Sequence, residues 1–232
     1  MSGFIGIVCG LKSEANAVRV SLKAAGVDMS KVKIGVSGAN ADRAEEIAQG
    51  FLDDGAKAIV SAGLCGGLDP ALKTGELVLG ERVVSAKGDI VIADKRLSAA
   101  ADKFSPRHVA IFGSDEIVDS IEKKRALFQR YAAETVDMES HGAARASAKA
   151  EIPFIAIRVV ADGSDRILPK AALRAVTPSG GVNVMNVLVD CVRAPQQFEE
   201  IFALGRDSGA ATNVLSRDLG GFLGAFLLAL DL

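Results

Sequence analysis

Three acidic residues lie close to predicted strands, where a parallel sheet places its ligands. Glu139 lies where a short apolar step gives way to an alanine-rich helix, and Asp162 lies just past the apolar segment IPFIAIRVV. Glu14 lies in the first turn after the first strand, where the helix dipole alone would favour an acid. Ligands in open α/β sheets bind beyond the carboxyl ends of the strands. One site could therefore hold Glu139 and Asp162 together.

Arg158 is a charged residue inside the apolar run IAIRVV. A buried guanidinium must be paired, because an unpaired buried charge is costly. The candidate partners are Glu14, Glu139 or a bound anion. Spacing alone leaves a structural ion pair and a ligand-binding role open.

Closely spaced glycines follow the third predicted strand, in a loop from Gly63 to Pro70. Such glycines let backbone N–H groups approach a ligand, but they also form tight turns. The stretch matches neither G-x-G-x-x-G nor a Walker A loop, so it does not indicate a nucleotide cofactor. His108 and His141 lack partners at metal or triad spacing, so we interpret both as structural or surface residues and expect no metal site.

Alternating strands and helices must position these residues. Strands are predicted at 4–9, 32–36, 58–62, 77–85, 89–93, 109–112 and 153–160, and helices at 13–25 (with Ser13 as cap), 41–53, 99–104, 116–131 and 140–150. Repeated β–α units indicate an α/β fold with a mainly parallel sheet and helices on both faces.

The C-terminal region has a different pattern. We predict helices over 182–192, 196–204 and 206–219, followed by Gly220-Gly221 and an apolar segment, 222–230. That segment must pack on the body, on another subunit or on a lipid surface. It is too short to span a bilayer, which requires about 20 residues.

Bulk properties restrict the remaining possibilities. A chain of 232 residues can be one α/β domain, and its 49% hydrophobic content can fill a sizeable core. The net charge of −2 does not suggest a nucleic-acid partner. Cys9, Cys65 and Cys191 show no C-x-x-C spacing, and no signal peptide is visible. We therefore expect reduced thiols and a cytoplasmic protein.

Three segments together resemble the purine nucleoside phosphorylase and nucleosidase family, which includes the methylthioadenosine/S-adenosylhomocysteine nucleosidases. They are GIVCGLKSEA (6–15), VSAGLCGGLDPALKTGELVL (60–79), and 136–165, with VDMES and PFIAIRVVADGSD. VDMESH, RVVADGSDRILP and RDSGAA are more similar to the hopanoid-associated phosphorylase branch, understood to remove adenine from adenosylhopane. The resemblance implies a single-domain, three-layer αβα nucleoside phosphorylase-like fold over 1–232, with a mixed, largely parallel sheet and a helical C-terminal extension from about residue 195.

The resemblance also implies a mechanism. A purine is a poor leaving group unless its N7 is protonated or hydrogen-bonded, and Asp162 would supply that proton. To be protonated at pH 7, an ordinary aspartate needs about 4 kcal/mol from its site. Glu139 would accept hydrogen bonds from the ribose hydroxyls, Met138 would lie against the ribose, and Glu14 would activate water. The backbone near Ile117 would contact the base.

Two positions depart from the nucleosidase pattern. Leu64, in the glycine-rich loop beside Gly63, stands where the nucleosidases usually have a serine, and Ala161 replaces the serine before the catalytic aspartate. The loss of a hydroxyl at Leu64, together with the apolar segment 222–230, predicts a substrate with a large apolar group on the ribose 5′ carbon. The same segment is a candidate for peripheral contact with the inner face of a membrane.

The nucleophile stays open between water and phosphate. Phosphorylases hold phosphate with several basic residues, and the candidates here are Arg158, Arg43 and Lys12. Glu14 argues for water, because a carboxylate repels phosphate, whereas the name of the hopanoid-associated branch argues for phosphate. Inorganic phosphate is thus the only candidate co-substrate, and no other cofactor is expected.

Other functional classes compete with this interpretation. The first alternatives are an ordinary methylthioadenosine/S-adenosylhomocysteine nucleosidase and a general purine nucleoside phosphorylase. The second is a non-catalytic nucleoside-binding protein, against which the combination of Glu14, Glu139 and Asp162 argues. A Rossmann-type oxidoreductase lacks its glycine fingerprint. Related enzymes often complete their sites across a dimer, so we expect a homodimer or higher oligomer.

Overall fold

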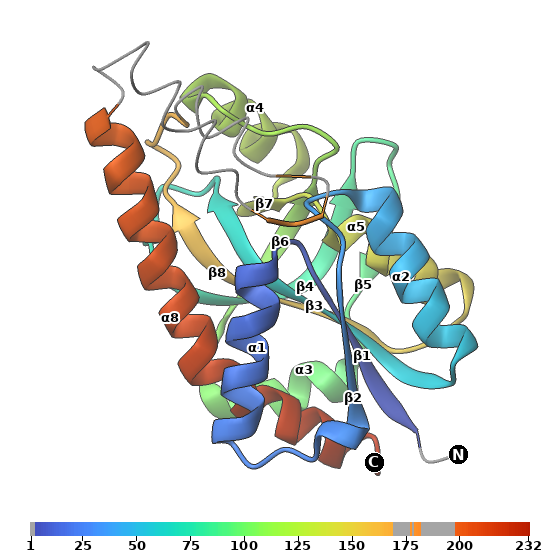
Figure 1. The fold of residues 1–232 in the computed structure, drawn as a ribbon. Coiled ribbons are helices and arrows are strands. Elements are labelled where there is room, and N and C mark those ends of the chain that lie inside the picture. The colour runs from blue at the N-terminus through green and yellow to red at the C-terminus, as the bar shows by residue number, and fades with distance from the viewer. Residues whose placement is uncertain (1–2, 169–176, 178, 182–197) are drawn as a thin grey trace.

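The computed structural model of the chain describes residues 3–168, 177, 179–181 and 198–232 (Figure 1). Its strands are β1 (Phe4–Cys9), β2 (Val32–Val36), β3 (Ala56–Gly67), β4 (Leu77–Ser85), β5 (Ile90–Ile92), β6 (Arg107–Gly113), β7 (Thr135–Asp137) and β8 (Phe154–Asp162). Its α-helices are α1 (Lys12–Ala24), α2 (Ala41–Asp53), α3 (Lys95–Ala101), α4 (Ile121–Tyr131), α5 (Ser140–Lys149) and α8 (Phe198–Ala229). Short 3₁₀ turns span Met29–Lys31 and Asp102–Phe104.

The described strands form one mixed sheet, in the order β2-β1-β3-β7-β6-β4-β5, with β8 between β3 and β4. β8 runs parallel to β3 and antiparallel to β4. Because β7 joins the end of β3 to β6, and β6 pairs with β4, the strands β3, β8, β4, β6 and β7 close into a ring. The expected α/β fold with a mixed, largely parallel sheet is confirmed.

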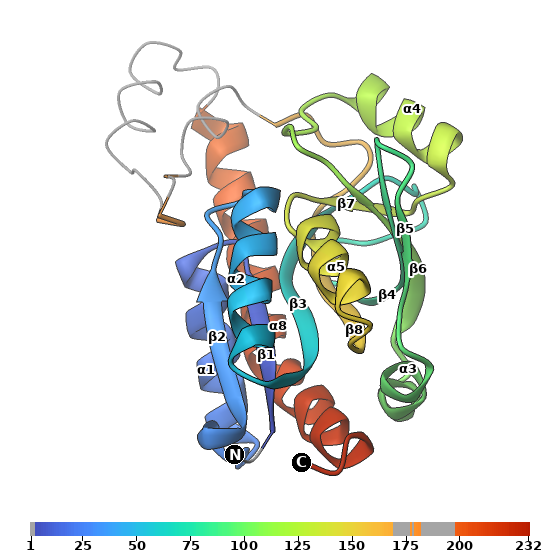
Figure 2. The ribbon, with the colours of Figure 1, turned by 90° about the vertical axis from the view of Figure 1, so that its right-hand side faces the viewer.

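Helices cover both faces of this sheet (Figures 1 and 2). One apolar cluster joins β1, β3 and β8 to α1, α3 and α8, and a second joins the other face to α2 and α5. A third, smaller cluster lies under α4. The spacing of apolar residues along each element determines which faces are covered. The β8 strand is buried at every position, whereas α2 buries only Ala41, Ala44 and Ala48 on one stripe.

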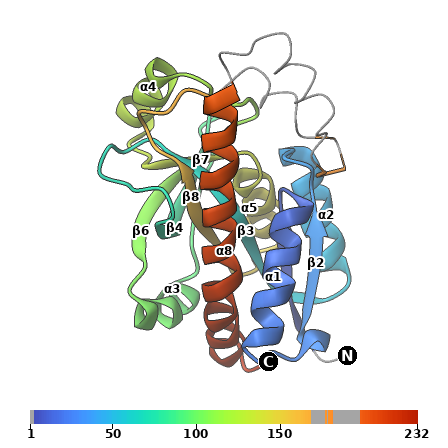
Figure 3. The same cartoon turned by 60° about the vertical axis from the view of Figure 1, so that its left-hand side comes forward.

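The C-terminal helix corrects the prediction of separate helices over 196–204 and 206–219. α8 runs without interruption from Phe198 to Ala229, beside α1 (Figure 3). Gly220 does not end the helix. Its backbone N–H donates to Ser21 Oγ at 2.7 Å, and a Cβ there would lie 2.7 Å from the Cβ of Ala25. Glycine therefore permits close packing of α8 on α1. The helix predicted at 182–192 lies outside the described residues.

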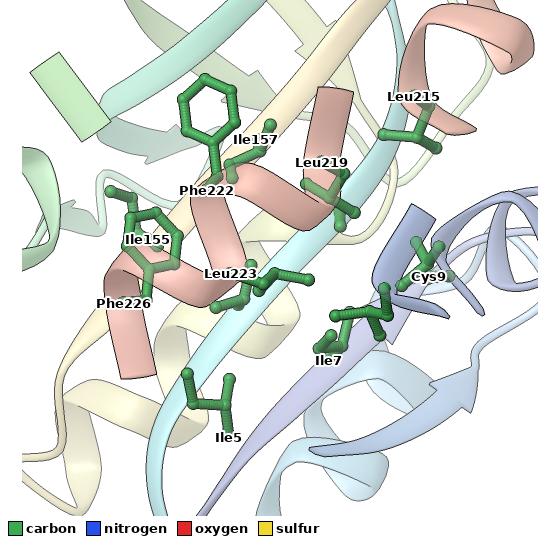
Figure 4. Close-up of a cluster of buried hydrophobic side chains, with 14 of the residues drawn as sticks. Ile5, Ile7, Cys9, Ile155, Ile157, Leu215, Leu219, Phe222, Leu223 and Phe226 are labelled. Atoms are coloured by element: carbon green, nitrogen blue, oxygen red, sulfur yellow. The ribbon is translucent and has the colours of Figure 1, made fainter. Parts of the chain in front are cut away.

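The apolar segment 222–230 belongs to the core. Phe222, Leu223 and Phe226 are at most 2% exposed and pack with side chains of β1 and β8 (Figure 4). Of the large apolar residues in this segment, only Leu228 is strongly exposed, at 76%. The expectation of a membrane-contacting face is therefore not supported, because most of the same side chains fill the interior. Within the described residues, no helix is both long and apolar enough to cross a bilayer.

Three element boundaries also differ from prediction. The glycine-rich stretch is not a loop, since β3 continues through it to Gly67. α4 begins at Ile121, five residues later than predicted, because Ser120 Oγ accepts the backbone N–H of Lys123 and caps the helix there. α3 begins at Lys95, four residues earlier than predicted, after Asp94, whose side chain accepts two backbone N–H groups.

Candidate active site

A cavity of about 250 Å³ lies at the carboxyl ends of β3, β7 and β8. Its polar wall contains Glu14, Lys124, Asp137, Glu139 and Asp162. Its apolar wall includes Leu11, Leu64, Ile117, Val118, Leu168 and Leu204. The sheet thus brings together the three acids that the sequence predicted to meet.

Glu14 is held by three backbone N–H groups. Its Oε2 accepts from Gly10 at 2.9 Å and from Leu11 at 2.8 Å, so Glu14, rather than the predicted Ser13, closes the start of α1. Its Oε1 accepts from Leu64 on β3 at 2.8 Å. A Cβ at Gly63 would lie 2.7 Å from the same carboxylate, so glycine lets Glu14 lie against the strand. Burial raises the pKa of Glu14, although Arg158 and these donors oppose the shift.

Arg158 is fully buried and is not part of the cavity wall. Its Nε donates to Asp137 Oδ2 at 2.7 Å, and its Nη2 donates to Ser61 Oγ at 2.7 Å and to Ser140 Oγ at 2.9 Å. The same Nη2 lies 3.5 Å from Glu139 Oε2. Glu139 was an expected partner, but the closest partner, Asp137, was not.

This arrangement leaves the two neighbouring acids in different states. Burial would raise the pKa of Asp137, but Arg158 and the Ser140 hydrogen bonds hold it below its ordinary value. Burial and the nearby Asp137 charge raise the pKa of Glu139 to about 8, against the opposing effect of Arg158. Asp137 is therefore the ionised partner of Arg158, and Glu139 holds its proton at neutral pH in the free site.

The raised pKa of Glu139 predicts that the free energy of unfolding depends on pH. Between the ordinary glutamate pKa of about 4.3 and a pKa of about 8, the folded state binds one more proton than the unfolded state, so the free energy of unfolding falls as pH rises. Glu139→Gln removes this proton. We expect urea denaturation to show a smaller loss of stability from about pH 5 to about pH 8 in the variant than in the wild type, at about 1.4 kcal/mol per pKa unit. Parallel curves for the two proteins would refute the raised pKa.

Asp162 has a partner that the sequence did not predict. The Lys124 side chain on α4 is 1% exposed, and its Nζ donates to Asp162 Oδ2 and, at 2.6 Å, to the Gly163 carbonyl oxygen. Burial raises the pKa of Asp162, while Lys124 opposes that shift. One signal was available: Lys124 shares a helical stripe with Leu127, Phe128 and Tyr131, which pack on the core under α4.

The other predicted site residues lie in or beside the cavity. Met138, Leu64 and Ile117 line it, with Ile117 in the loop before α4 rather than in a helix. Gly63 lies beneath Glu14. Lys12 and Arg43, proposed with Arg158 as phosphate ligands, do not line the cavity.

Both histidines pair with acids, and the described cysteines are buried, with Cys65 at the cavity wall. His141 Nε2 lies 2.9 Å from Asp115, and His108 lies between Glu81 and Asp102. Cys9 and Cys65 are buried free thiols, while Cys191 lies outside the described residues. No group of three or more metal-ligating side chains occurs in the described part of the chain.

A mixed α/β sheet with this cavity at the carboxyl ends of its strands is the fold of the nucleoside phosphorylases and hydrolases. Residues 11–193 match the phosphorylase superfamily. The chain belongs to that superfamily and is an enzyme of it. The predicted family resemblance is thus confirmed at this level.

Solved structures show the same fold at low sequence identity. A 5′-methylthioadenosine/S-adenosylhomocysteine nucleosidase from Colwellia psychrerythraea 34H, solved with adenine, matches with a TM-score of 0.68 and 20% identity, over 97% of this chain and 96% of that one. Futalosine hydrolase of Helicobacter pylori gives 0.68 and 16%, over 96% and 97%. The Helicobacter pylori 5′-methylthioadenosine/S-adenosylhomocysteine nucleosidase, solved with an immucillin, gives 0.67 and 18%, over 93% and 97%. No curated protein matches the sequence significantly.

Proposed function

We propose that this enzyme cleaves the N-glycosidic bond of an adenosyl compound and releases adenine by attack of water at C1′ of the ribose. The observation that carries the proposal is the meeting of Glu14, Glu139 and Asp162 at one cavity, each held differently. Glu14 accepts three backbone N–H groups, Glu139 lies against Arg158, and Asp162 pairs with Lys124. Three separate tasks can then be assigned to three acids.

Each task follows from the chemistry of the bond. As C1′–N9 breaks, the sugar becomes cationic and the base becomes anionic, so Asp162 gives N7 a proton. Glu139 forms hydrogen bonds with the ribose hydroxyls, beside Met138. Glu14, fixed in orientation by its donors, takes a proton from the attacking water. General acid or base assistance of this kind typically contributes about 10²–10⁴ in rate.

Water is favoured over phosphate by the charges around the cavity. Five acidic residues line it: Glu14, Glu116, Asp137, Glu139 and Asp162. Among the lining residues in the described part of the chain, Lys124 is the only cationic one, and it is paired with Asp162. The Arg158 guanidinium already donates hydrogen bonds to Asp137, Ser61 and Ser140. An anionic nucleophile would therefore find no unpaired cation among these lining residues to balance its charge.

An apolar wall supports a substrate with an apolar 5′ substituent. Leu11, Leu64, Leu168 and Leu204 line the same cavity as the acids. Each CH₂ group buried there would contribute about 0.8 kcal/mol. Together with the resemblance to the hopanoid-associated branch, this makes adenosylhopane our leading candidate. Methylthioadenosine, S-adenosylhomocysteine and other purine nucleosides are the alternatives, and a non-catalytic nucleoside-binding protein is the second.

The test follows free adenine from adenosylhopane, methylthioadenosine, S-adenosylhomocysteine and adenosine, each with and without phosphate. We expect adenine in phosphate-free buffer, a free ribose hydroxyl at C1′ in the product, and the highest kcat/KM for the adenosyl lipid. Glu14→Gln should lower kcat by about 10²-fold or more, because the amide cannot accept the proton of water. Glu46→Gln, an exposed acid on α2, is the matched control.

Each negative outcome removes a different part of the proposal. A strict phosphate requirement with a ribose 1-phosphate product would replace hydrolysis by phosphorolysis and leave Glu14 a binding role. A preference for methylthioadenosine over the lipid would overturn the substrate assignment alone. Binding of adenosyl compounds without any release of adenine would support the non-catalytic alternative.

A further inference from the structure

We infer that Lys124 supplies, through Asp162, the proton that the departing base takes up. The inference rests on the proposed cleavage of a purine nucleoside and assigns a task to a residue outside the three acids. Lys124 is among the largest fully buried side chains of the protein and lines the same cavity as those acids. Buried lysines are rare, because burying an ammonium is costly unless it is paired.

The contacts of Lys124 place its ammonium group against the Asp162 carboxyl group at the cavity wall. Of the three Nζ donors, one reaches Asp162 Oδ2 and another reaches the Gly163 carbonyl oxygen. Within the described residues, no other side chain donates to the Asp162 carboxyl group, so Oδ1 is left for a ligand in the cavity. A base held there would contact Asp162 on one side, with Lys124 on the other.

The pair keeps a proton beside the departing base at neutral pH without requiring a protonated aspartate. An isolated aspartate at neutral pH has lost its proton, and keeping it would require about 4 kcal/mol. An ammonium keeps its proton at neutral pH, so the Lys124–Asp162 pair holds one transferable proton between its two members. Burial also raises the pKa of Asp162, which brings the carboxyl group closer to accepting that proton.

The step then balances as follows. As the C1′–N9 electron pair goes to the base, a proton passes from Lys124 Nζ to the ionised Asp162 carboxylate, and Asp162 passes it on to N7. Neutral adenine leaves, Lys124 becomes a neutral amine, and Asp162 stays ionised. Water adds hydroxide to C1′, and its proton passes to Glu14 and then to solvent, from which Lys124 is recharged. No other reactant is consumed.

Other charged groups around the pair are Arg166 after β8, Glu116 in the loop before α4, and Glu139 and Glu14 across the cavity. Arg166 is paired with Asp207 at 2.7 Å. These groups stay unchanged in the test. The competing role for Lys124 is structural, as an ion pair that fixes α4 to the end of β8.

The experiment compares two leaving groups in one enzyme. Adenine needs a proton to leave, whereas 4-nitrophenolate leaves as a stable anion. Lys124→Met removes the ammonium and keeps the chain length, and Lys124→Arg keeps the charge on a group that does not give up its proton. Lys123→Met, next to it on α4, removes an exposed lysine paired with Asp119 and is the matched control. Rates with an adenine nucleoside and with 4-nitrophenyl riboside are measured across pH.

We expect Lys124→Met and Lys124→Arg to lose about 10²-fold or more in kcat with the adenine nucleoside. With 4-nitrophenyl riboside the loss should be under about 3-fold, while Lys123→Met matches the wild type on both. With the adenine nucleoside, the wild-type rate should be level through neutral pH. In Lys124→Met it should fall as Asp162 loses its proton.

Equal losses on both substrates would make Lys124 structural. An unchanged pH profile with the adenine nucleoside would also overturn the inference, whether or not the wild type accepts the riboside. Restoration by Lys124→Arg would show that charge, not proton supply, is the requirement. Failure of the wild type to cleave any adenine nucleoside would refute the proposed function and this inference with it.

Discussion

Replacing Asp162 by asparagine should reduce adenine release by about 10²–10⁴-fold, through kcat rather than KM. The amide keeps the shape of the side chain and can still accept a hydrogen bond from Lys124, so the substrate should still bind. It cannot pass a proton to N7, so the base must leave as an anion. Steady-state kinetics with an adenine nucleoside measure both constants.

Asp165→Asn is the matched control for this variant. Asp165 lies three residues further along the same segment but is exposed, so its replacement should leave kcat unchanged. Circular dichroism of Asp162→Asn should match that of the wild type, which separates loss of chemistry from loss of fold. Turnover close to the wild-type level in Asp162→Asn would exclude this carboxyl group from the mechanism.

The strands of the fold could be predicted because their apolar runs are long and bounded. The exceptions are the short β7, which is not among the predicted strands, and the end of β3, where Gly63, Gly66 and Gly67 indicated a loop. The glycines belong to the strand because carboxylates lie against it. A Cβ at Gly63 would contact Glu14, and one at Gly66 would lie 3.4 Å from the oxygens of Asp162. Composition alone does not distinguish a glycine in a turn from a glycine in a strand that lets another side chain pack against the backbone.

The C-terminal helix shows a different limit. Gly205 and the pair Gly220-Gly221 predicted breaks, since glycine lowers helix propensity by about 1 kcal/mol relative to alanine. Burial of Leu219, Phe222, Leu223 and Phe226 against the sheet and α1 outweighs that cost. The packing of α8 on α1 joins residues about 200 positions apart in the chain, so no local sequence pattern predicts it.

The site residues that could be predicted are those that directly follow a predicted strand. Glu14, Glu139 and Asp162 each lie at the carboxyl end of a strand, and one edge of the sheet collects them. Lys124 comes from a helix 38 residues earlier than Asp162, so only its position on an apolar stripe could indicate burial. The ionisation of Asp137 depends on which acid Arg158 reaches, and only the folded structure decides that. The assignment of tasks to these residues, and the expected dimer, stay predictions.

Removing the buried guanidinium should destabilise the protein strongly. Arg158→Met keeps much of the side-chain volume but leaves Asp137 and Glu139 without their cation, and breaking a buried pair typically costs about 3–5 kcal/mol. Arg166→Met is the control. Arg166 is 40% exposed and paired with Asp207, and an exposed ion pair contributes at most about 1 kcal/mol. The measurement is the free energy of unfolding in urea.

The pH dependence of that loss identifies its cause. In the wild type, Arg158 holds the pKa of Asp137 below its ordinary value, so the pair adds stability above the pKa of an unfolded aspartate, and this is lost as pH falls. Without Arg158, burial raises the pKa of Asp137 instead. The deficit of Arg158→Met should therefore be small in acid and grow towards neutral pH. Adding Asp137→Asn should recover part of it, because the unpaired charge is gone. A deficit that is independent of pH would mean that Arg158 acts by packing rather than by charge.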